Sequence, residues 1–415
     1  MTAEAAAASI VRRTQALDRA RAFPLGALSS LETSLLLTIA IKRFDAAGPV
    51  KGVVAAAAGF GLLGAPVATA FARRLPLRAM TLATVLAVVS AMGYGLAASG
   101  PLALFVLGAV IGVAAIQLPL PLLTQMYDEN YPISERGRRV GFAMSVKVVA
   151  AALGGIILGA VLSRSSDDWR VVVLVGVVLA LLVAASNAFT PSTRLDRVAG
   201  RRNRPWPHFD LLRHDPALRI ILGAWMVMGF GNLMLLPLRI EYLANAKYGI
   251  GADATFITLV TVTVPSITRL ALMPLVGVLF DRLEFFRARI AVNLLFILYV
   301  AVFFTSDTDV GFVLGAVAFG FASAGGELMW SLWVTKFAPA GRVADYMGLH
   351  TFFTGVRAVV APMFGFVIVS RLALTSVAMI GVTLMVVSSL MLAPSARRAG
   401  LRRPTPPGVA RDLGT

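Results

Sequence analysis

The feature that most constrains this chain is a succession of apolar runs, each about twenty residues long, that fills almost all of it. Hydrophobic residues make up 58% of the 415-residue sequence, charged residues 14%, and the mean hydropathy is +0.81. A soluble domain carries about 25% charged residues, and no core at this length hides so much apolar surface from water. We therefore expect the runs to cross a lipid bilayer as helices, because a backbone in hydrocarbon must satisfy its own hydrogen bonds.

Twelve runs are long enough to span a bilayer. They cover residues 23–42, 50–72, 76–98, 101–124, 140–162, 170–190, 219–240, 255–279, 289–306, 310–335, 345–370 and 372–393. A polar stretch rich in Arg and Pro separates the sixth run from the seventh, and a short amphipathic helix is expected there around Asp210–Leu218.

The predicted fold is an all-α integral membrane protein with twelve transmembrane helices in two pseudo-symmetric six-helix bundles. The expected domains are a cytoplasmic N-terminal segment (1–22), two bundles (23–190 and 219–394), a cytoplasmic linker (191–218) and a basic cytoplasmic tail (395–415).

The distribution of basic residues predicts the orientation. With the N-terminus in the cytoplasm, cytoplasmic segments carry 27 of the 38 Lys and Arg residues and outside segments carry 8. This asymmetry obeys the positive-inside rule and predicts cytoplasmic termini. The net charge of +17 then follows from topology, and we expect no nucleic-acid partner. The first 22 residues contain no apolar core or cleavage site of a signal peptide.

Composition bears on chemistry and location as well. The sequence has no cysteine, which excludes disulfides and thiolate metal sites. The three histidines (His208, His214 and His350) lie in or near polar connections, so a histidine metal cluster is not expected. The absence of cysteine, together with the abundance of Ala, Arg and Gly, favours a bacterial inner (plasma) membrane.

A hexamer, FVLGAV, occurs at residues 105–110 and again at 312–317, which is a separation of 207 positions. The same separation relates three further pairs: Pro132 and Pro339, Gly141 and Gly348, Arg164 and Arg371. Several identities in one register indicate an internal duplication, and two halves with six crossings each share one orientation. The hexamer is then a packing face, in which Gly108 and Gly315 allow close helix approach.

The connection between the eighth and ninth runs reads GVLFDRLEFFRAR, from Gly277 to Arg289. Its Gly-x-x-x-Asp-Arg start resembles the loop signature of the major facilitator superfamily. The equivalent connection between the second and third runs, ATAFARRLPLR, keeps the arginines but has Ala68 and Ala72 at the Gly and Asp positions. The drug-antiporter pattern, an Arg in the fourth run and Gly-Pro-x-x-Gly-Gly in the fifth, is absent, which argues against that assignment.

The resemblance implies a secondary active transporter that rocks around a central site, with the first two helices of each three-helix unit lining the cavity. It also implies a cytoplasmic gating motif, formed by Gly277, Asp281, Arg282, Arg287, Arg73 and Arg78. There an acidic residue would pair with arginine and cap a neighbouring helix in one conformation, and release it in another. The alternative is a loop that only satisfies topology.

Five ionisable residues fall well within the runs, away from their ends: Glu32, Lys147, Arg269, Glu327 and Arg357. A charge near the bilayer centre costs at least ~2.5–3.5 kcal/mol, so each needs a protein or water environment. They lie on the first, fifth, eighth, tenth and eleventh runs, in agreement with the cavity-lining arrangement that the resemblance implies.

Two neutral polar residues, Gln117 and Asn232, lie near mid-depth and complete the candidate substrate and coupling residues. Pro119 and Pro121 interrupt the fourth run, and Gly229–Gly231 with Pro237 are expected to loosen the seventh.

The roles of the charged residues leave alternatives open. Lys147 either snorkels to the surface or reaches substrate. Arg269 and Arg357 either bind substrate or pair permanently with Glu32 or Glu327. Three cations against two anions leave one positive charge, which favours an anionic or carboxylate-bearing substrate because a guanidinium fork suits a carboxylate or phosphate.

Glu32 and Glu327 are the candidate proton carriers. The sequence leaves sodium as an alternative coupling ion.

We therefore expect a monomeric secondary active transporter that couples the movement of a small solute to protons, without cofactor and without enzymatic activity. The alternatives are a membrane-embedded solute sensor or receptor on a transporter scaffold, an efflux pump for amphipathic compounds, and a membrane enzyme. Against an enzyme, Asp128, Glu129, Asp345 and His350 form no recognised catalytic spacing. No phosphate-binding Gly-x-x-x-x-Gly-Lys-Ser/Thr loop occurs, which argues against direct use of ATP.

Overall fold

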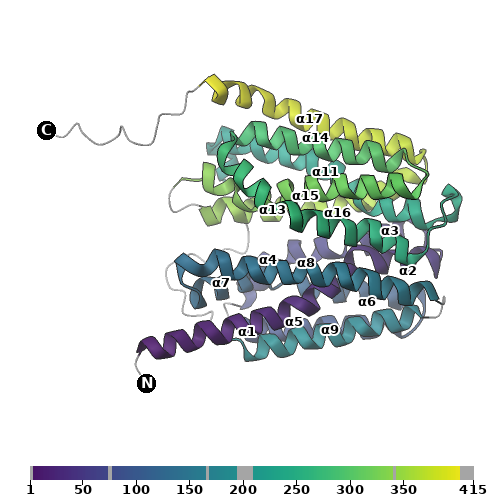
Figure 1. The fold of residues 1–415 in the computed structure, drawn as a ribbon. Helices are drawn as coiled ribbons and strands as arrows, with labels where there is room; N and C mark the ends of the chain where they lie inside the picture. Colours follow the sequence, from purple (N-terminus) through teal and green to yellow (C-terminus); the bar gives the residue numbers. More distant parts are fainter. Residues whose placement is uncertain (1–2, 73–76, 165–167, 194–208, 340–342, 402–415) are drawn as a thin grey trace.

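The computed structural model describes residues 3–72, 77–164, 168–193, 209–339 and 343–401. Within these ranges the chain folds into long helices joined by short connections, and two bundles lie side by side (Figure 1).

Nine helices and a π-helical turn form the N-terminal bundle. In chain order they are α1 (Ala3–Ser30), η1 (Leu31–Leu35), α2 (Leu36–Lys42), α3 (Gly48–Ala55), α4 (Ala57–Ala72), α5 (Ala79–Ala98), α6 (Leu102–Gln117), α7 (Leu120–Asn130), α8 (Ile133–Arg164) and α9 (Trp169–Phe189).

The C-terminal bundle repeats this plan after the linker. Its elements are α10 (Leu211–His214), α11 (Pro216–Ala244), η3 (Ala246–Tyr248), α12 (Ala254–Thr258), η4 (Leu259–Thr263), α13 (Val264–Arg282), α14 (Phe285–Phe304), α15 (Asp309–Phe337), α16 (Val343–Val369) and α17 (Leu374–Leu401).

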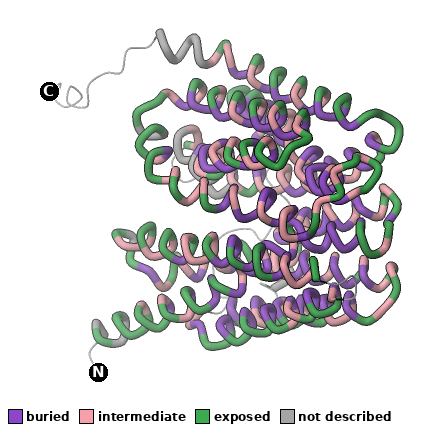
Figure 2. The backbone as a smooth tube through the Cα atoms, turned by 45° about the vertical axis from the view of Figure 1, so that its right-hand side comes forward, coloured by how far each residue is buried: buried purple, intermediate pink, exposed green. Residues whose placement is uncertain are grey.

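The described residues contain eleven helical stretches that are long and apolar enough to cross a membrane, and α3 with α4, bent by 47°, makes a twelfth. The twelve-helix prediction is confirmed. Figure 2 shows buried residues gathered inside each bundle. Many large apolar residues are exposed, among them Met92 (69% exposed) and Leu390 (65%). Such an apolar exterior suits lipid, and the protein is a multi-pass integral membrane protein.

The N-terminal segment differs from the expectation of a separate cytoplasmic stretch before residue 23. Helix α1 begins at Ala3 and runs into the first span without a break. Arg21 is only 2% exposed, and it donates to Asn187 Oδ1 and to Tyr127 Oη, both at 3.1 Å. Hydrogen bonds to α7 and α9 therefore draw the polar end of this segment into the bundle.

The repeated hexamer packs in the same way in both bundles. A β-carbon on Gly108 of α6 would collide with the backbone of Gly93 and Ala97 on α5, and one on Gly315 of α15 would lie 2.9 Å from Cβ of Phe303 on α14. Phe105 and Phe312, the first residues of the two copies, are both fully buried. The predicted role of the hexamer as a face for close helix packing is confirmed.

The start of α1 and the end of α17 lie at the same end of the molecule, on the left of Figure 1, which we call the terminal end; the opposite end is the far end. The bundles meet where α16 packs on α3 and α4, α8 packs on α12 and α13, and α2 packs on α11. Hydrogen bonds join described residues of the two bundles from mid-depth to the far end. They link Ser163 to Thr255 (2.9 Å), Thr261 to Ser34 (3.0 Å) and Thr263 to the carbonyl of Ala152 (3.0 Å).

Candidate functional site

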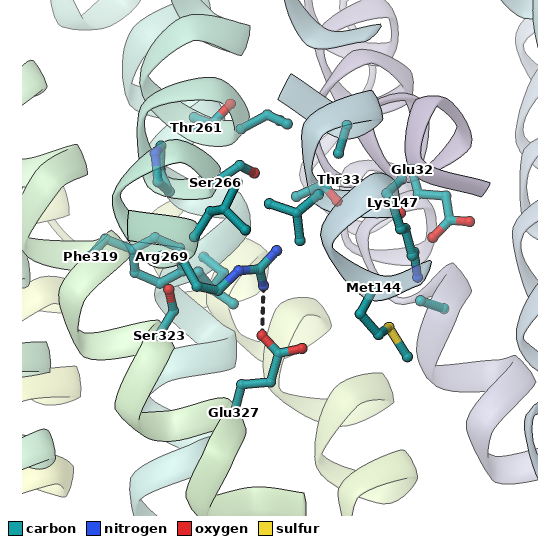
Figure 3. A pocket seen from close by; sticks show the side chains of 18 of the residues that line it. Glu32, Thr33, Met144, Lys147, Thr261, Ser266, Arg269, Phe319, Ser323 and Glu327 are labelled. Carbon is teal, nitrogen blue, oxygen red and sulfur yellow. Dashed lines mark hydrogen bonds and ion pairs between the residues drawn. The ribbon is translucent and has the colours of Figure 1, made fainter. Parts of the chain in front are cut away.

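A cavity of about 900 Å³, which we call the central cavity, lies between the two bundles (Figure 3). The N-terminal bundle lines it with residues of α1, η1, α2, α3, α4 and α8, and the C-terminal bundle with residues of α11, η4, α13, α15 and α16. The lining reaches Gly141 and Pro274, which lie toward the terminal ends of α8 and α13. Since the bundles are joined at the far end, the cavity extends toward the terminal end.

Glu32 and Lys147 are the charged residues that the N-terminal bundle contributes to this cavity. Glu32 lies in the π-helical turn η1, and such turns are frequent at functional sites because the extra residue redirects neighbouring side chains. Gln117 Nε2 donates to Glu32 Oε2 at 3.0 Å, and Lys147 attracts the same carboxylate. Lys147 therefore points into the cavity beside Glu32 and does not snorkel to the surface (Figure 3).

Arg269 and Glu327 face them from the C-terminal bundle (Figure 3). Arg269 Nη1 lies 2.8 Å from Glu327 Oε2, and the two side chains are 26% and 52% exposed. This exposure places the pair on the surface of the cavity, within reach of water. The sequence left open whether Arg269 and Arg357 form ion pairs with Glu32 or Glu327, and in the structure Arg269 pairs with Glu327.

Arg239 also lines the central cavity, and it was not among the site residues predicted from the sequence. It is 2% exposed, and its guanidinium lies 4.2 Å from the ring centre of Phe319 and 5.6 Å from that of Tyr299. Arg239 lies one residue before the predicted end of the seventh run, but helix α11 continues to Ala244, so Arg239 is a buried residue within the helix and not at its end. Stacking on two aromatic rings replaces part of the lost hydration.

A smaller space of about 290 Å³, the side chamber, lies within the C-terminal bundle and shares Arg269 and Glu327 with the central cavity. Asn232 and Arg357, both predicted site residues, line it together with Arg289. Arg357 contacts Gly229, where a β-carbon would collide with its guanidinium. The seven predicted substrate and coupling residues therefore all lie in or directly beside two connected spaces.

Arg289 and His350 were misplaced by the sequence analysis. Arg289 was counted with the loop before α14, yet it is 2% exposed and stacks on Trp225 with its guanidinium 3.8 Å from the ring centre. His350 was expected in or near a polar connection, but it is 1% exposed within α16, and its ring packs against Trp225, Trp330 and Trp333. Aromatic contacts bury both residues, and no hydropathy window detects such contacts.

The aromatic residues beyond Glu327 have two different roles. Trp330 lines the side chamber and donates from Nε1 to Thr354 Oγ1 at 3.3 Å. Trp333 is fully buried in the core of the bundle. One residue of the cluster is therefore a binding-surface candidate and the other is a packing residue.

The far end is closed by an ion pair that the sequence did not reveal. Lys51, on α3, places Nζ 2.8 Å from both carboxylate oxygens of Glu241, on α11, and the two side chains are 8% and 0% exposed. The sequence analysis identified neither residue as part of a site. The ion pair joins the two bundles, and both side chains are removed from water.

The predicted gating motif lies mostly at the surface of the terminal end. Arg78, Arg282 and Arg287 are exposed, and a β-carbon at Gly277 would meet open space. Arg73 and the side chain of Asp281 lie outside the described residues. The gating role of this motif stays a prediction.

The acidic cap of α14 comes from a different residue of the same loop. Glu284 accepts hydrogen bonds from the backbone amides of Phe286 (2.9 Å) and Arg287 (3.0 Å). A carboxylate at this position satisfies free amides and opposes the positive end of the helix dipole.

Of the two helix irregularities predicted from proline and glycine, in the fourth and seventh spans, the structure contains the first and not the second. The fourth span is interrupted between Gln117 and Leu120, where α6 ends and α7 begins, as the prolines predict. Helix α11 is continuous through Gly229–Gly231 and Pro237, contrary to the expected loosening. A β-carbon on Gly231 would lie 2.8 Å from the carbonyl oxygen of Gly381 on α17, so this glycine serves close packing.

Two repeated six-helix bundles around a charged central cavity define a membrane transporter fold. The chain belongs to the major facilitator superfamily, whose family model matches residues 22–362. That superfamily consists of transporters and not of enzymes. Among curated proteins, no sequence matches this chain.

Solved structures of similar fold include known transporters. A point mutant of the nucleoside transporter NupG has a TM-score of 0.74 and 14% identity, over 93% of this chain and 99% of that one. A D-xylose-proton symporter has a TM-score of 0.69 and 14% identity, covering 92% and 97%. The inward open conformation of the xylose transporter XylE from E. coli has a TM-score of 0.63 and 16% identity, covering 93% and 95%. At these identities the likeness establishes the fold alone.

Proposed function

We propose that this protein is a secondary active transporter that moves a small solute by alternating access, coupled to protons. One observation carries the proposal: both bundles contribute ionisable side chains to one cavity that is closed at the far end. A buried charge is retained at a cost, so charges gathered on a single cavity mark a pathway for solute and ions. Opposed bundles that rock around such a site expose it to each side of the membrane in turn.

The orientation proposed here has both termini in the cytoplasm of a bacterial cell, with the protein as a monomer in the inner membrane. The basic residues of the terminal end support it through the positive-inside rule. With this orientation the structure is an inward-facing state, whose central cavity extends toward the cytoplasm and whose outer end is closed by the Lys51–Glu241 pair.

Glu32 and Glu327 are the proposed proton carriers. Glu327 contacts Arg269, and Glu32 accepts a hydrogen bond from the neutral amide of Gln117 near Lys147. A carboxylate that loses its cationic partner during rocking gains a proton, and one that regains the partner releases it. Exchange of partners therefore links proton movement to the conformational change.

Proteoliposomes test this function directly. We expect an imposed pH gradient to drive accumulation of a solute from a panel of organic acids, sugars, amino acids and nucleosides. Glu32→Gln or Glu327→Gln should abolish gradient-driven accumulation and leave exchange of solute down its own gradient. Asp309→Asn, which removes an exposed carboxylate outside the cavity, is the matched control. Full gradient-driven transport by both glutamine variants would refute proton coupling through these residues.

A further inference from the structure

The side chamber contains two arginines that lack an acidic partner among the described residues. Arg289 is 2% exposed and Arg357 is 6% exposed. The carboxylate that lines the chamber, Glu327, is already bound to Arg269. The two guanidiniums lie close enough to repel each other, and His350 lies near both.

All contacts of these two guanidiniums within the described chain are neutral. Arg289 donates from Nη2 to Met228 Sδ at 3.1 Å and stacks on Trp225. Arg357 donates from Nη1 to the carbonyl of Trp225 and from Nη2 to Thr354 Oγ1 at 3.3 Å.

Four buried polar atoms of residues that line the chamber have no hydrogen-bond partner among the described residues: Arg289 Nη1, Arg357 Nε, Trp225 Nε1 and Asn232 Oδ1. Three unbonded N–H groups and a side-chain amide thus meet at one space, and the amide can turn its NH₂ group toward a ligand.

A chain gains no stability from two buried, mutually repelling cations, because each loses its hydration without an opposite charge in return. Their retention needs a ligand that supplies the missing charge. A guanidinium presents a planar fork of donors that matches a carboxylate or a phosphate. The indole rings of Trp225 and Trp330 add apolar walls to the chamber, and these suit an organic body attached to the acidic group.

We propose that the side chamber binds the acidic group of an organic anion through Arg289 and Arg357, with Asn232 as a third polar contact. This inference rests on the transport function proposed above, since it names the substrate class. The substrate enters from the central cavity past the Arg269–Glu327 pair, which stands where the two spaces meet. Gly229 keeps the Arg357 guanidinium in place because a larger residue would occupy its position.

Thermal unfolding of the purified full chain, followed through tryptophan fluorescence, tests the inference with three probes: benzoate, its neutral analogue benzamide, and inorganic phosphate. Ionic strength is held constant with sodium chloride. We expect a saturable rise in Tm with benzoate, with phosphate or with both, and none with benzamide. The anion that gives the rise distinguishes a carboxylate site from a phosphate site.

Variants of Arg289 separate ligand binding from a structural role. Arg289→Met should raise the Tm of the unliganded protein, because it removes an unpaired buried charge, and should abolish the anion-dependent rise. Arg289→Lys keeps the charge without the fork and should weaken anion binding by at least about tenfold. Arg371→Met, in the same bundle but exposed and outside the chamber, should change neither quantity.

Three results would overturn the inference. The first is a Tm of the wild type that rises with neither anion. The second is an anion-dependent rise in Tm that is undiminished in both Arg289→Met and Arg357→Met. The third is a Tm of unliganded Arg289→Met below that of the unliganded wild type. Binding and transport can fail independently. Anion binding without any solute flux would refute the transport function and support the anion site. Flux of neutral solutes without anion binding would refute the anion site and support the transport function.

Discussion

Removing Glu241 should open the far end of the transporter. In the structure its carboxylate accepts hydrogen bonds from Lys51 Nζ and Asn245 Nδ2, both at 2.8 Å, and it forms an ion pair with Lys247 Nζ at 3.5 Å. Glu241→Gln leaves the ammonium of Lys51 at an interface where it is 8% exposed, with the ring of Phe366 at 5.7 Å. That ammonium regains water only when the bundles part.

The size of the effect follows from the burial of the pair. Breaking a buried ion pair by removing one partner costs about 3–5 kcal/mol, and the whole cost falls on the closed state. If the closed state is destabilised by about 3 kcal/mol, the population that is open at the far end rises by roughly a hundredfold, since each 1.4 kcal/mol is a factor of ten. Lys51→Met should have a smaller effect, because Glu241 keeps Asn245 and the half-exposed Lys247.

Cysteine accessibility measures this shift, and the chain has no native cysteine to remove. Ser266 lines the central cavity and is 7% exposed, so Ser266→Cys reports access to the cavity. A membrane-impermeant maleimide added at the far side should label this cysteine much faster in Glu241→Gln than in the parent. Asp309→Asn, which removes an exposed charge at the start of α15, should leave the rate unchanged. Equal labelling rates in Glu241→Gln and the parent would refute the idea that this pair holds the far end closed.

Two packing predictions follow from the glycines. Gly229→Ala should displace the guanidinium of Arg357 and lower stability by about 1–3 kcal/mol, seen as a lower Tm, and an unchanged Tm would show that the arginine is free to move. Gly108→Ala forces a β-carbon against the backbone of α5 and should cost at least as much, whereas Gly95→Ala, with open space around it, should be neutral. Equal Tm values for the Gly108 and Gly95 variants would contradict the packing described for the hexamer.

The sequence predicted those parts of the molecule that depend on local composition or on the repeat. Runs of apolar residues located the twelve spans, because a helix in lipid needs about twenty of them. The repeated spacing of 207 placed Gly108 and Gly315 at equivalent helix contacts, and the prolines marked the break after Gln117. Charges in the middle of a run, such as Glu32 and Arg269, could be assigned to the cavity because lipid excludes them.

Residues near the ends of the runs could not be assigned in this way. Lys51, Arg239, Glu241 and Arg289 lie where a hydropathy window ends, and a charge at such a position normally reaches water. Their burial comes from contacts that composition does not encode, such as the approach of α3 to α11 or the stacking of Arg289 on Trp225.

Spin-label distances across both ends of the molecule test alternating access most directly. One pair of labels, on Arg43 and Asp309, reports the far end, and another, on Arg138 and Arg282, reports the terminal end; all four residues are exposed. On going from the parent to Glu241→Gln, the far-end distance should lengthen while the terminal-end distance shortens. Distances that stay fixed, or that change in the same direction at both ends, would contradict two bundles rocking around the central cavity.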